Sequence, residues 1–230
     1  MAEAENKGNI RLIITDDGSH SLFVPALNET YHSFHGALQE SRHVFIKMGL
    51  EYALNQKASP HVLEVGLGTG LNALLAAECA ETYKISVHFT SIEAFPVDYS
   101  LAASLNYPKF IAHPDAEQWF EDIHRSDWHV DRPIHSLFTL KKLHTKLEDC
   151  QLPSSQFDVV FFDAFAPSKQ AELWGMEILT RIVESMASQS VFVTYCAKGQ
   201  LKRDLKALGL QVETLPGPPG KKEMVRALKF

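Results

Sequence analysis

The sequence is poor in cysteine, has no long apolar run and carries no overall positive charge, and each absence excludes a class of protein. Its three cysteines, Cys79, Cys150 and Cys196, are far apart and form no C-x-x-C pair, so they predict free thiols and no zinc or redox centre. No apolar run approaches the roughly 20 residues of a membrane span, and the first residues lack the layout of a secretion signal. The eleven histidines show no metal-ligand spacing. We expect a soluble, cytoplasmic protein without a metal or a membrane partner.

The 230 residues, 45% of them hydrophobic, suffice for one substantial α/β domain with a small appendage. From His61 onward, strand-like and helix-like segments alternate, which predicts a mostly parallel sheet covered by helices. The expected strands are 61–65, 85–93, 135–140, 157–165, 190–196, 211–215 and 223–229. The expected helices between them are 71–81, 97–106, 171–187 and 199–209. The last two strands follow each other directly, so an antiparallel hairpin should complete a seven-stranded sheet.

The part of the chain before this alternation predicts a smaller N-terminal unit, residues 1–56, beside a main domain of residues 57–230. Two short apolar segments flank Asp17-Gly18, a pair that favours a tight β-hairpin because glycine tolerates a positive φ. In residues 36–55, apolar side chains recur at helical spacing and predict an amphipathic helix. We expect the hairpin and the helix to pack on the pocket of the main domain.

The turn after the first strand of the alternation has the sequence VGLGTGLN, with Gly66, Gly68 and Gly70 at alternate positions. Such a turn is the usual ligand site of an open α/β sheet. Its spacing differs from the G-x-G-x-x-G of dinucleotide-binding proteins, whose glycines shape a turn against a pyrophosphate, so neither NAD nor FAD is expected. It resembles the first motif of class I S-adenosyl-L-methionine (SAM) methyltransferases, in which an acid at the position of Glu64 helps to hold the methionine portion. A tight turn without a ligand is the alternative.

Glu93 closes the second expected strand of the sheet. At this position an acid can accept hydrogen bonds from both ribose hydroxyls of a nucleotide. A solvated acid at a strand end is the alternative interpretation. In combination with the glycine loop, however, Glu93 favours binding of the ribose of SAM.

A strand with the sequence FDVVFF is followed by DAFAP, which brings Asp163 and Phe165 to the same edge of the sheet as the glycine loop. A carboxylate there costs desolvation energy unless it is paired or has a task. Methyltransferases of exocyclic amino groups place an acid or amide before Pro-Pro-aromatic at this point, so the position matches although the motif does not. Asp163 and Phe165 are the catalytic candidates, with Asp163 orienting or deprotonating an amine. The alternatives are a helix cap or a turn acid for Asp163 and ordinary packing, instead of base stacking, for Phe165 and Trp174.

Longer segments carry a more specific resemblance, which covers nearly the whole chain from Asp17. FFDAFAP…ELW, TYCAKGQLKRDLKALG, PGPPGKKEMVRA and DGSHSLFVPALNETYHSFHGALQESRHVFIKMGL resemble the methyltransferase domain of MnmC, a bifunctional tRNA wobble-uridine enzyme, and its stand-alone homologues. The resemblance implies a Rossmann-like class I SAM methyltransferase. It also implies methyl transfer to the aminomethyl nitrogen of 5-aminomethyl-(2-thio)uridine in tRNA. Because the chain ends at Phe230, we expect it to lack the FAD-dependent oxidase domain.

The resemblance also assigns roles residue by residue. Cofactor binding falls to Tyr31, Glu40, Glu64, Gly66, Gly68, Gly70, Asn72, Glu93 and Asp163. Asp163 is in addition the acid beside the transferred methyl group. Tyr31, His32, Gly36 and Glu40 match a segment that should fold over the cofactor pocket, and helix packing and capping is the alternative for them.

One departure from the family concerns the adenine of SAM. Before the fourth strand the family usually has Gly-Asp, and this Asp can meet the adenine amino group, whereas this chain has Thr145-Lys146. Glu148 or Asp149 can replace the missing acid only if the loop shifts. Adenine recognition is therefore not predicted by the resemblance.

The C-terminal end of the chain is basic. Residues 198–230 contain eight Lys or Arg against three Asp or Glu, although the whole chain has a formal charge of −6. The candidates for contacts with tRNA phosphates are Lys198, Lys202, Arg203, Lys221 and Lys222. A solvated helix face is the alternative for this basic segment.

Two other functions are compatible with these residues. A SAM-dependent methyltransferase of a small amine would turn over without RNA, and a catalytically idle SAM-fold module would bind RNA or a protein and would not need Asp163. The resemblance leaves open whether a separate oxidase or upstream tRNA-modifying enzymes cooperate with this protein.

Overall fold

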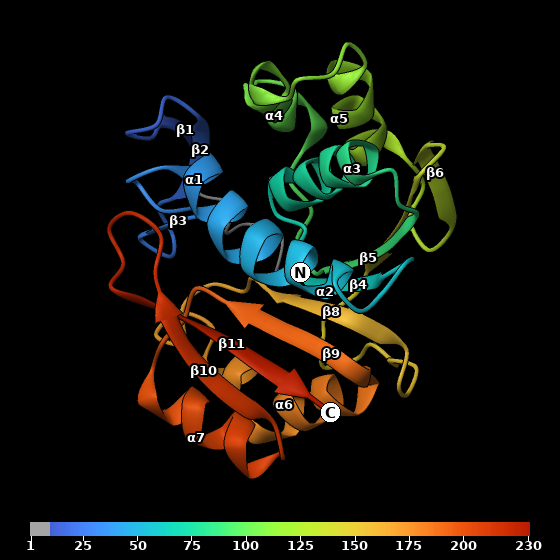
Figure 1. Ribbon diagram of the computed structural model, residues 1–230. Coiled ribbons are helices and arrows are strands. Elements are labelled where there is room, and N and C mark those ends of the chain that lie inside the picture. Colours follow the sequence, from blue (N-terminus) through green and yellow to red (C-terminus); the bar gives the residue numbers. More distant parts are fainter. Residues whose placement is uncertain (1–9) are drawn as a thin grey trace.

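A mixed sheet of eight strands forms the centre of the structure, a computed structural model that describes residues 10–230 (Figure 1). The strands are β4 (His61–Val65), β5 (Val87–Glu93), β6 (Asp131–His135), β7 (Phe138–His144), β8 (Phe157–Phe162), β9 (Met186–Thr194), β10 (Gln211–Pro216) and β11 (Glu223–Lys229). Their order is β10-β11-β9-β8-β4-β5-β7-β6. Pairing is parallel from β9 to β7 and antiparallel towards both edges, at the β7–β6, β9–β11 and β11–β10 pairs. The predicted α/β class and its mostly parallel sheet are confirmed.

The sheet has one strand more than the seven that the sequence predicts, and the additional strand is β6. Segment 135–140, predicted as one strand, spans the end of β6, a turn and the start of β7. The first three residues of β6, Asp131, Arg132 and Pro133, are exposed. Proline argues against a central strand, but an edge strand tolerates it because the open side needs no N–H donor. The polar sequence of β6 therefore carries no strand signal.

Helices cover both faces of the sheet. The longer ones are α3 (Leu71–Tyr83), α5 (Ala116–Arg125), α6 (Met176–Ser185) and α7 (Gly199–Ala207). The N-terminal helix, α3 and α5 pack on one face, and α6 and α7 pack on the other (Figure 1). Side chains of β8 alternate between the two apolar cores, with Val159 and Phe161 in the first and Val160 and Phe162 in the second. A strand buried on both faces reads as a continuous apolar run, which explains the sequence of β8.

Short helical segments complete the fold. They are α4 (Tyr99–Ala102), η2 (Tyr107–Phe110) and η3 (Ala171–Trp174). The predicted helices 71–81 and 199–209 are confirmed as α3 and α7. The predicted helix 97–106 forms only the single turn of α4, and the predicted helix 171–187 is divided into η3 and α6 at Gly175, whose backbone is extended.

A small antiparallel sheet lies beside the main one at the N-terminus. It consists of β1 (Arg11–Ile14), β2 (His20–Val24) and β3 (Glu29–Thr30). The predicted hairpin of β1 and β2 is confirmed. Its turn contains Gly18, with a φ of 82°, and Asp17, whose Oδ1 accepts a hydrogen bond from the backbone N–H of Ser19 at 3.0 Å. The third strand, β3, was not predicted, and it leads directly into Tyr31 and His32.

The predicted N-terminal helix is confirmed, but its middle part is a π-helix. The helix consists of α1 (Ala37–Ser41), η1 (Arg42–Leu50) and α2 (Glu51–Leu54), which follow one another without a break. The ring of Phe45 lies 5.3 Å from the ring of Phe161 on β8. A Cβ on Gly49 would lie 2.8 Å from Cγ2 of Val193 on β9, so glycine allows the helix to approach the sheet closely. The N-terminal helix is thus packed on the central strands.

All three cysteines are free, as predicted, and all are buried. Cys79 belongs to the apolar core under α3, and Cys150 and Cys196 belong to the core on the opposite face. Burial raises the pKa of each thiol, that of Cys79 to about 12. The thiolate is the reactive form, so none of the three is a candidate nucleophile.

Candidate active site

A cavity of about 560 Å³ opens at the carboxyl ends of the parallel strands. Its walls come from the segments that follow β4, β5, β7, β8 and β9, from residues 29–34 and from the loop between β10 and β11. Ligands of open α/β sheets bind at this edge. Among the predicted site residues, those that line the cavity are Tyr31, His32, Glu40, Gly66, Gly68, Glu93, Asp163, Phe165 and Lys221.

The glycine loop connects β4 to α3 at the bottom of the cavity. Gly66, Gly68 and Gly70 have φ values of 92°, 51° and 75°, a region that side chains disfavour. The backbone N–H of Gly68 donates to Oε2 of Glu93 at 2.9 Å, and a Cβ on Gly68 would lie 3.0 Å from the ring of Tyr31. The loop is therefore held between Glu93 and Tyr31 in a conformation that leaves no room for a side chain at this point.

Glu93 accepts two backbone hydrogen bonds at the end of β5. Its Oε2 binds the N–H of Gly68, and its Oε1 binds the N–H of Phe95 at 2.7 Å. A carboxylate offers about four lone-pair positions, so each oxygen can accept a further hydrogen bond from a ligand in the cavity. The two backbone donors fix the orientation of this carboxylate.

Glu64 and Asn72 lie next to the loop and are buried, although neither lines the cavity. The hydroxyl of Ser91 donates to Oε2 of Glu64 at 2.5 Å. Within residues 10–230, Oε1 of Glu64 and Oδ1 of Asn72 are buried without a hydrogen-bond partner. Burial raises the pKa of Glu64 well above its usual range, and the charge of Asp163 acts in the same direction. Hydrogen bonding with the side chain of Asn72 acts against this rise in the pKa of Glu64. A protonated Glu64 can donate to an amide oxygen, so Glu64 and Asn72 can satisfy each other.

Asp163 directly follows β8 and faces the cavity. Asn72 Nδ2 donates to Oδ2 of Asp163 at 2.8 Å. Burial raises the pKa of Asp163 to about 7, the charge of Glu40 acts in the same direction, and Asn72 and Lys221 act against it. An acid with a pKa near the working pH can both accept and return a proton, which suits general acid–base catalysis. The predicted helix-cap alternative does not describe this side chain, since Asp163 is not the N-cap residue of a helix.

Aromatic side chains flank Asp163. The rings of Tyr31 and Phe165 meet edge to face with centroids 5.2 Å apart, and both line the cavity. Trp174 is buried outside the cavity, where its indole N–H donates to the carbonyl of Phe165 at 2.8 Å. Trp174 therefore packs and supports the backbone of Phe165, whereas Phe165 and Tyr31 line the cavity.

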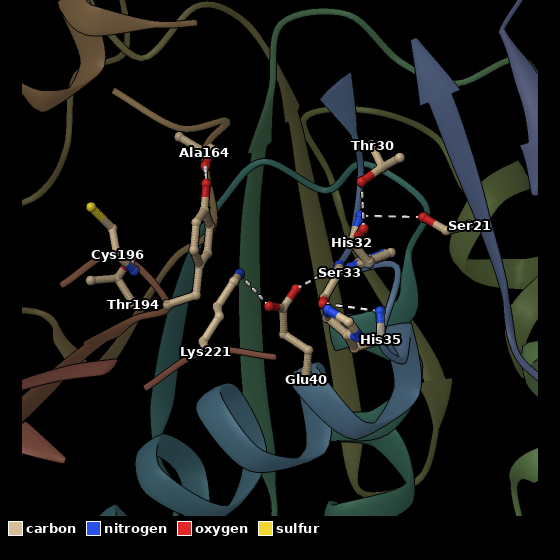
Figure 2. A network of polar contacts seen from close by, with 11 residues as sticks. Ser21, Thr30, His32, Ser33, His35, Glu40, Ala164, Thr194, Cys196 and Lys221 are labelled. Atoms are coloured by element: carbon tan, nitrogen blue, oxygen red, sulfur yellow. Dashed lines mark hydrogen bonds and ion pairs between the residues drawn. The ribbon is translucent and has the colours of Figure 1, made fainter. Parts of the chain in front are cut away.

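An ion pair crosses from α1 to the β10–β11 loop inside this site. Lys221 Nζ is paired with Oε2 of Glu40, as Figure 2 shows. Oε1 of Glu40 accepts a hydrogen bond from the backbone N–H of Ser33 at 3.0 Å. The same ammonium of Lys221 lies 3.8 Å from the ring centroid of Tyr195, whose hydroxyl donates to the carbonyl of Ala164 at 2.8 Å. The sequence placed Lys221 among the phosphate-binding residues, but its side chain lines the cavity.

The other predicted tRNA-binding residues lie outside the cavity. Lys198, Arg203 and Lys222 are exposed. Lys202 is half-buried and forms an ion pair with Glu223 at 2.8 Å. The five candidates thus divide into three exposed cations, Lys202 paired at the surface and Lys221 in the site.

Thr69 is a site residue that the sequence did not single out. Its hydroxyl contacts Nε2 of His32 at 2.7 Å and accepts a hydrogen bond from the hydroxyl of Tyr107 at 3.2 Å. Its carbonyl contacts Nε2 of His124 at 3.1 Å. Burial lowers the pKa of His32 and of His124 to about 4, so both rings are neutral near pH 7. The three partners of Thr69 lie far from it in the sequence, so no local sequence pattern could have predicted these contacts.

The loop after β7 contributes the residues that depart from the family pattern. Thr145, Lys146 and Glu148 line the cavity, whereas Asp149 does not. The backbone N–H of Thr145 donates to the carbonyl of Glu93 at 3.1 Å, which places the loop beside the ribose-binding candidate. Glu148 is therefore the acid of this loop that faces a ligand.

Residues 10–230 contain no group of three or more His, Cys, Asp or Glu that could hold a metal ion. In the same range, no helix is long and apolar enough to cross a membrane.

Comparisons with known proteins identify the family of the chain. Residues 116–230 match a family described as S-adenosyl-L-methionine-dependent methyltransferase. Over 236 residues the chain is 29% identical to the tRNA 5-methylaminomethyl-2-thiouridine biosynthesis bifunctional protein MnmC of Burkholderia multivorans, with 93% of this chain and 34% of the relative covered. It is 30% identical over 229 residues to the MnmC of Aromatoleum aromaticum, with 94% and 35% covered. The chain spans about a third of the length of these curated relatives.

A solved structure is similar over almost the whole chain. It is the crystal structure of MNMC2 from Aquifex aeolicus, which superimposes with a TM-score of 0.76 at 25% sequence identity. The match covers 97% of this chain and 71% of the other. The similarity therefore includes the N-terminal sheet and helix as well as the main sheet.

Proposed function

Since the chain belongs to the S-adenosyl-L-methionine-dependent methyltransferase family, we propose that it methylates the aminomethyl nitrogen of 5-aminomethyl-(2-thio)uridine at the wobble position of tRNA. The observation that carries the proposal is one cavity that combines the glycine loop, Glu93 and an acid of pKa about 7, Asp163. The names of the MnmC relatives, which state 5-methylaminomethyl-2-thiouridine biosynthesis, support the substrate. We further propose that the protein works where tRNA is found, in the cytoplasm.

The residues of the cavity fit SAM. The glycine loop offers a bare backbone surface, with no space for a Cβ at Gly68. Glu93 is oriented by two backbone donors, so its remaining lone pairs are available to the ribose hydroxyls. Glu64 and Asn72 are buried behind the loop and outside the cavity lining, where Asn72 donates to Asp163, so they support the site from behind. The spacing of the glycines lacks the pyrophosphate pattern, so NAD and FAD are not proposed as ligands.

When bound, SAM supplies a methyl group on a positively charged sulfur, which an uncharged amine can attack in line. The task of the protein is to hold that amine uncharged and aligned, and positioning of this kind can supply about 7 to 11 kcal/mol of the barrier. Asn72 holds Oδ2 of Asp163, and within residues 10–230 no hydrogen bond to Oδ1 is found. We propose that Oδ1 takes a proton from the substrate ammonium, which leaves the neutral amine directed at the methyl group.

We propose other residues for the recognition of the tRNA and of the adenine of SAM. Phe165 and Tyr31 present rings on which a nucleobase can stack, with Trp174 supporting Phe165 from behind. Lys198, Arg203 and Lys222 are exposed and are proposed to contact tRNA phosphates. Glu148 lines the cavity beside Thr145, and we propose that it replaces the usual Asp as the acceptor for the adenine amino group.

The test uses tRNA that carries 5-aminomethyl-2-thiouridine, SAM and the purified protein. Nucleoside analysis should detect conversion to the methylaminomethyl base, and the rate should fall with salt because tRNA docking is electrostatic. The matched comparison is the free aminomethyl nucleoside at the same concentration. Equal turnover of the free nucleoside, without dependence on RNA or salt, would instead indicate a small-amine methyltransferase. No methyl transfer to either substrate, with SAM bound, would indicate a non-catalytic module.

A further inference from the structure

Two neighbouring lysines in the β10–β11 loop have different surroundings. Lys222 is exposed. Lys221 lines the cavity and pairs with Glu40 (Figure 2). The ammonium of Lys221 also lies 3.8 Å from the ring centroid of Tyr195. The side chain of Glu40 is 5% exposed, so its partner neutralises a buried charge. A buried carboxylate without a partner is strongly disfavoured. Lys221 therefore stabilises the ionised form of Glu40 inside the cavity.

The fold fixes the loop that carries Lys221. Nε2 of His43 on the N-terminal helix contacts the carbonyl of Pro216 at 2.8 Å. A Cβ on Gly220 would overlap the ring of His35, so this part of the loop is packed against the segment before α1. The backbone N–H of Gly217 donates to the carbonyl of Lys222 at 3.1 Å and closes the loop on itself. These contacts direct Lys221 inward, next to Glu40.

Asp163 is surrounded by ionisable groups from several elements. Glu40 on α1, Glu64 on β4 and Tyr195 after β9 interact electrostatically with it, and each can only be neutral or negative. Lys221 is the cation that acts on Asp163 in the part of the chain that the structure describes. His32 feels the same pair of Glu40 and Lys221, but it is neutral because of its burial. Burial is the main cause of the raised pKa of Asp163, and the balance between Glu40 and Lys221 adjusts it further.

We propose that Lys221 is a positioning residue of the methyl-transfer site, which neutralises Glu40 and so keeps Asp163 ionised and available to the acceptor amine. The proposal rests on the proposed function, in which Asp163 receives a proton from that amine. Without Lys221, Glu40 and Asp163 lose the cation that acts on both of them, and the first proton bound by this pair of carboxylates is retained to a higher pH. Asp163 would then more often carry a proton already and could not take one from the substrate.

The first measurement needs no tRNA. Carboxyl ¹³C NMR of the full chain, labelled at aspartate and assigned with Asp163→Asn, follows the titration of Asp163. Lys221→Met should raise the apparent pKa of Asp163 by about one unit or more, because an opposite charge nearby is removed. Glu40→Gln should lower it, and the double variant should lie near the wild type. Lys221→Arg keeps the charge and should restore the titration, and Lys222→Met, which removes an exposed charge one residue away, should not move it.

The second measurement is the pH profile of single-turnover methyl transfer at saturating tRNA. In Lys221→Met its acid limb should move to higher pH by the same amount, and Lys221→Arg should bring it back. If Lys221→Met does not fold, Glu40→Gln makes the same test from the other partner, with an opposite shift.

Three outcomes are distinguishable. An unchanged titration of Asp163 in Lys221→Met and in Glu40→Gln overturns the proposal. Loss of tRNA affinity with an unchanged pH profile also overturns it, because Lys221 would then be a docking residue. If the titration shifts as expected but the wild type does not methylate tRNA, the electrostatic role of Lys221 is supported and the proposed substrate is wrong.

Discussion

The wall of the cavity formed by β4, β5 and the glycine loop is held through the backbone, whereas the wall formed by α1 and the β10–β11 loop is held through charged side chains. On the first wall, the N–H of Gly66 donates to the carbonyl of Ile92 at 2.9 Å. On the second wall, Glu40 and Lys221 form an ion pair across 181 residues of sequence. Backbone geometry hardly responds to pH, but an ion pair does. The first wall therefore suits a cofactor of fixed shape, and the second suits a substrate whose charge changes during the reaction.

Asp163 lies where the two walls meet. Its backbone N–H donates to the carbonyl of Val65 on β4 at 3.1 Å, and its carboxylate responds to Glu40 and Lys221. The difference between the walls can be tested at this residue and on either side of it.

The largest effect is expected for Asp163→Asn, which keeps the shape of the side chain but removes the proton acceptor. The single-turnover rate of methyl transfer should fall by about 100-fold or more, the usual contribution of a general base. The affinity for SAM, measured by calorimetry, should change little because the first wall is intact. Full activity of this variant would return Asp163 to a purely structural role.

The next effect is expected on the first wall. Glu93→Ala removes the proposed ribose acceptor and leaves the N–H groups of Gly68 and Phe95 without their partner. Binding of SAM should weaken by roughly 1.5 to 3 kcal/mol, which calorimetry measures directly. Asp149→Asn, a change to an exposed acid outside the cavity, is the control. A dissociation constant equal to that of the wild type would remove Glu93 from the cofactor site.

A smaller effect per residue is expected on the outer surface, beyond both walls. Replacing Lys198, Arg203 and Lys222 by Ala should weaken tRNA binding and lower its log–log salt dependence by about 0.7 to 0.9 units for each phosphate that is no longer bound. Lys202→Ala should have less effect, because Lys202 is already paired with Glu223. The rate at saturating tRNA should stay close to normal in all four single variants. A salt dependence unchanged in the triple variant would contradict the docking surface.

The smallest effect concerns stability against pH. The pKa of Asp163 is about 7 in the folded protein and about 3.9 in an unfolded chain. Between these values the folded state holds a proton that the unfolded state has released, so Asp163 makes stability fall as pH rises through this window. Asp163→Asn should therefore melt at a higher temperature than the wild type at pH 8, and the gap should close towards pH 4. A gap that is constant over this range would contradict the raised pKa.

The first wall could be predicted from the sequence because its signals are local. Gly66, Gly68 and Gly70 occupy one turn, and Glu93 ends the adjacent strand, so a motif and a strand pattern bring them together. The second wall could not be predicted in the same way. Lys221 belongs to a basic, proline-rich segment, and in sequence it has the same surroundings as Lys222. Only the packing of the loop against α1 separates the two.

The same limit applies to parts of the fold. Helix α5 is an exception: it went unpredicted although its sequence carries a local signal, since the buried Ala116, Trp119, Phe120 and Ile123 recur at helical spacing. The strand β6 was hidden by exposed polar residues and a proline. Helix 71–81 was predicted correctly because it is apolar almost throughout and starts directly after the glycine loop.

The three buried thiols can be used to measure local opening of the protein. A thiol reagent can modify them only when the surrounding structure opens, so the rate of labelling measures how often each region does so. Cys79 reports on the face that carries the N-terminal helix, and Cys150 and Cys196 report on the opposite face. Cys196 follows Tyr195, whose ring supports Lys221, so its protection should increase when the ion pair is strengthened and decrease in Lys221→Met. Mass spectrometry of the labelled chain would thus measure how often the second wall opens, separately from the opening of the two cores.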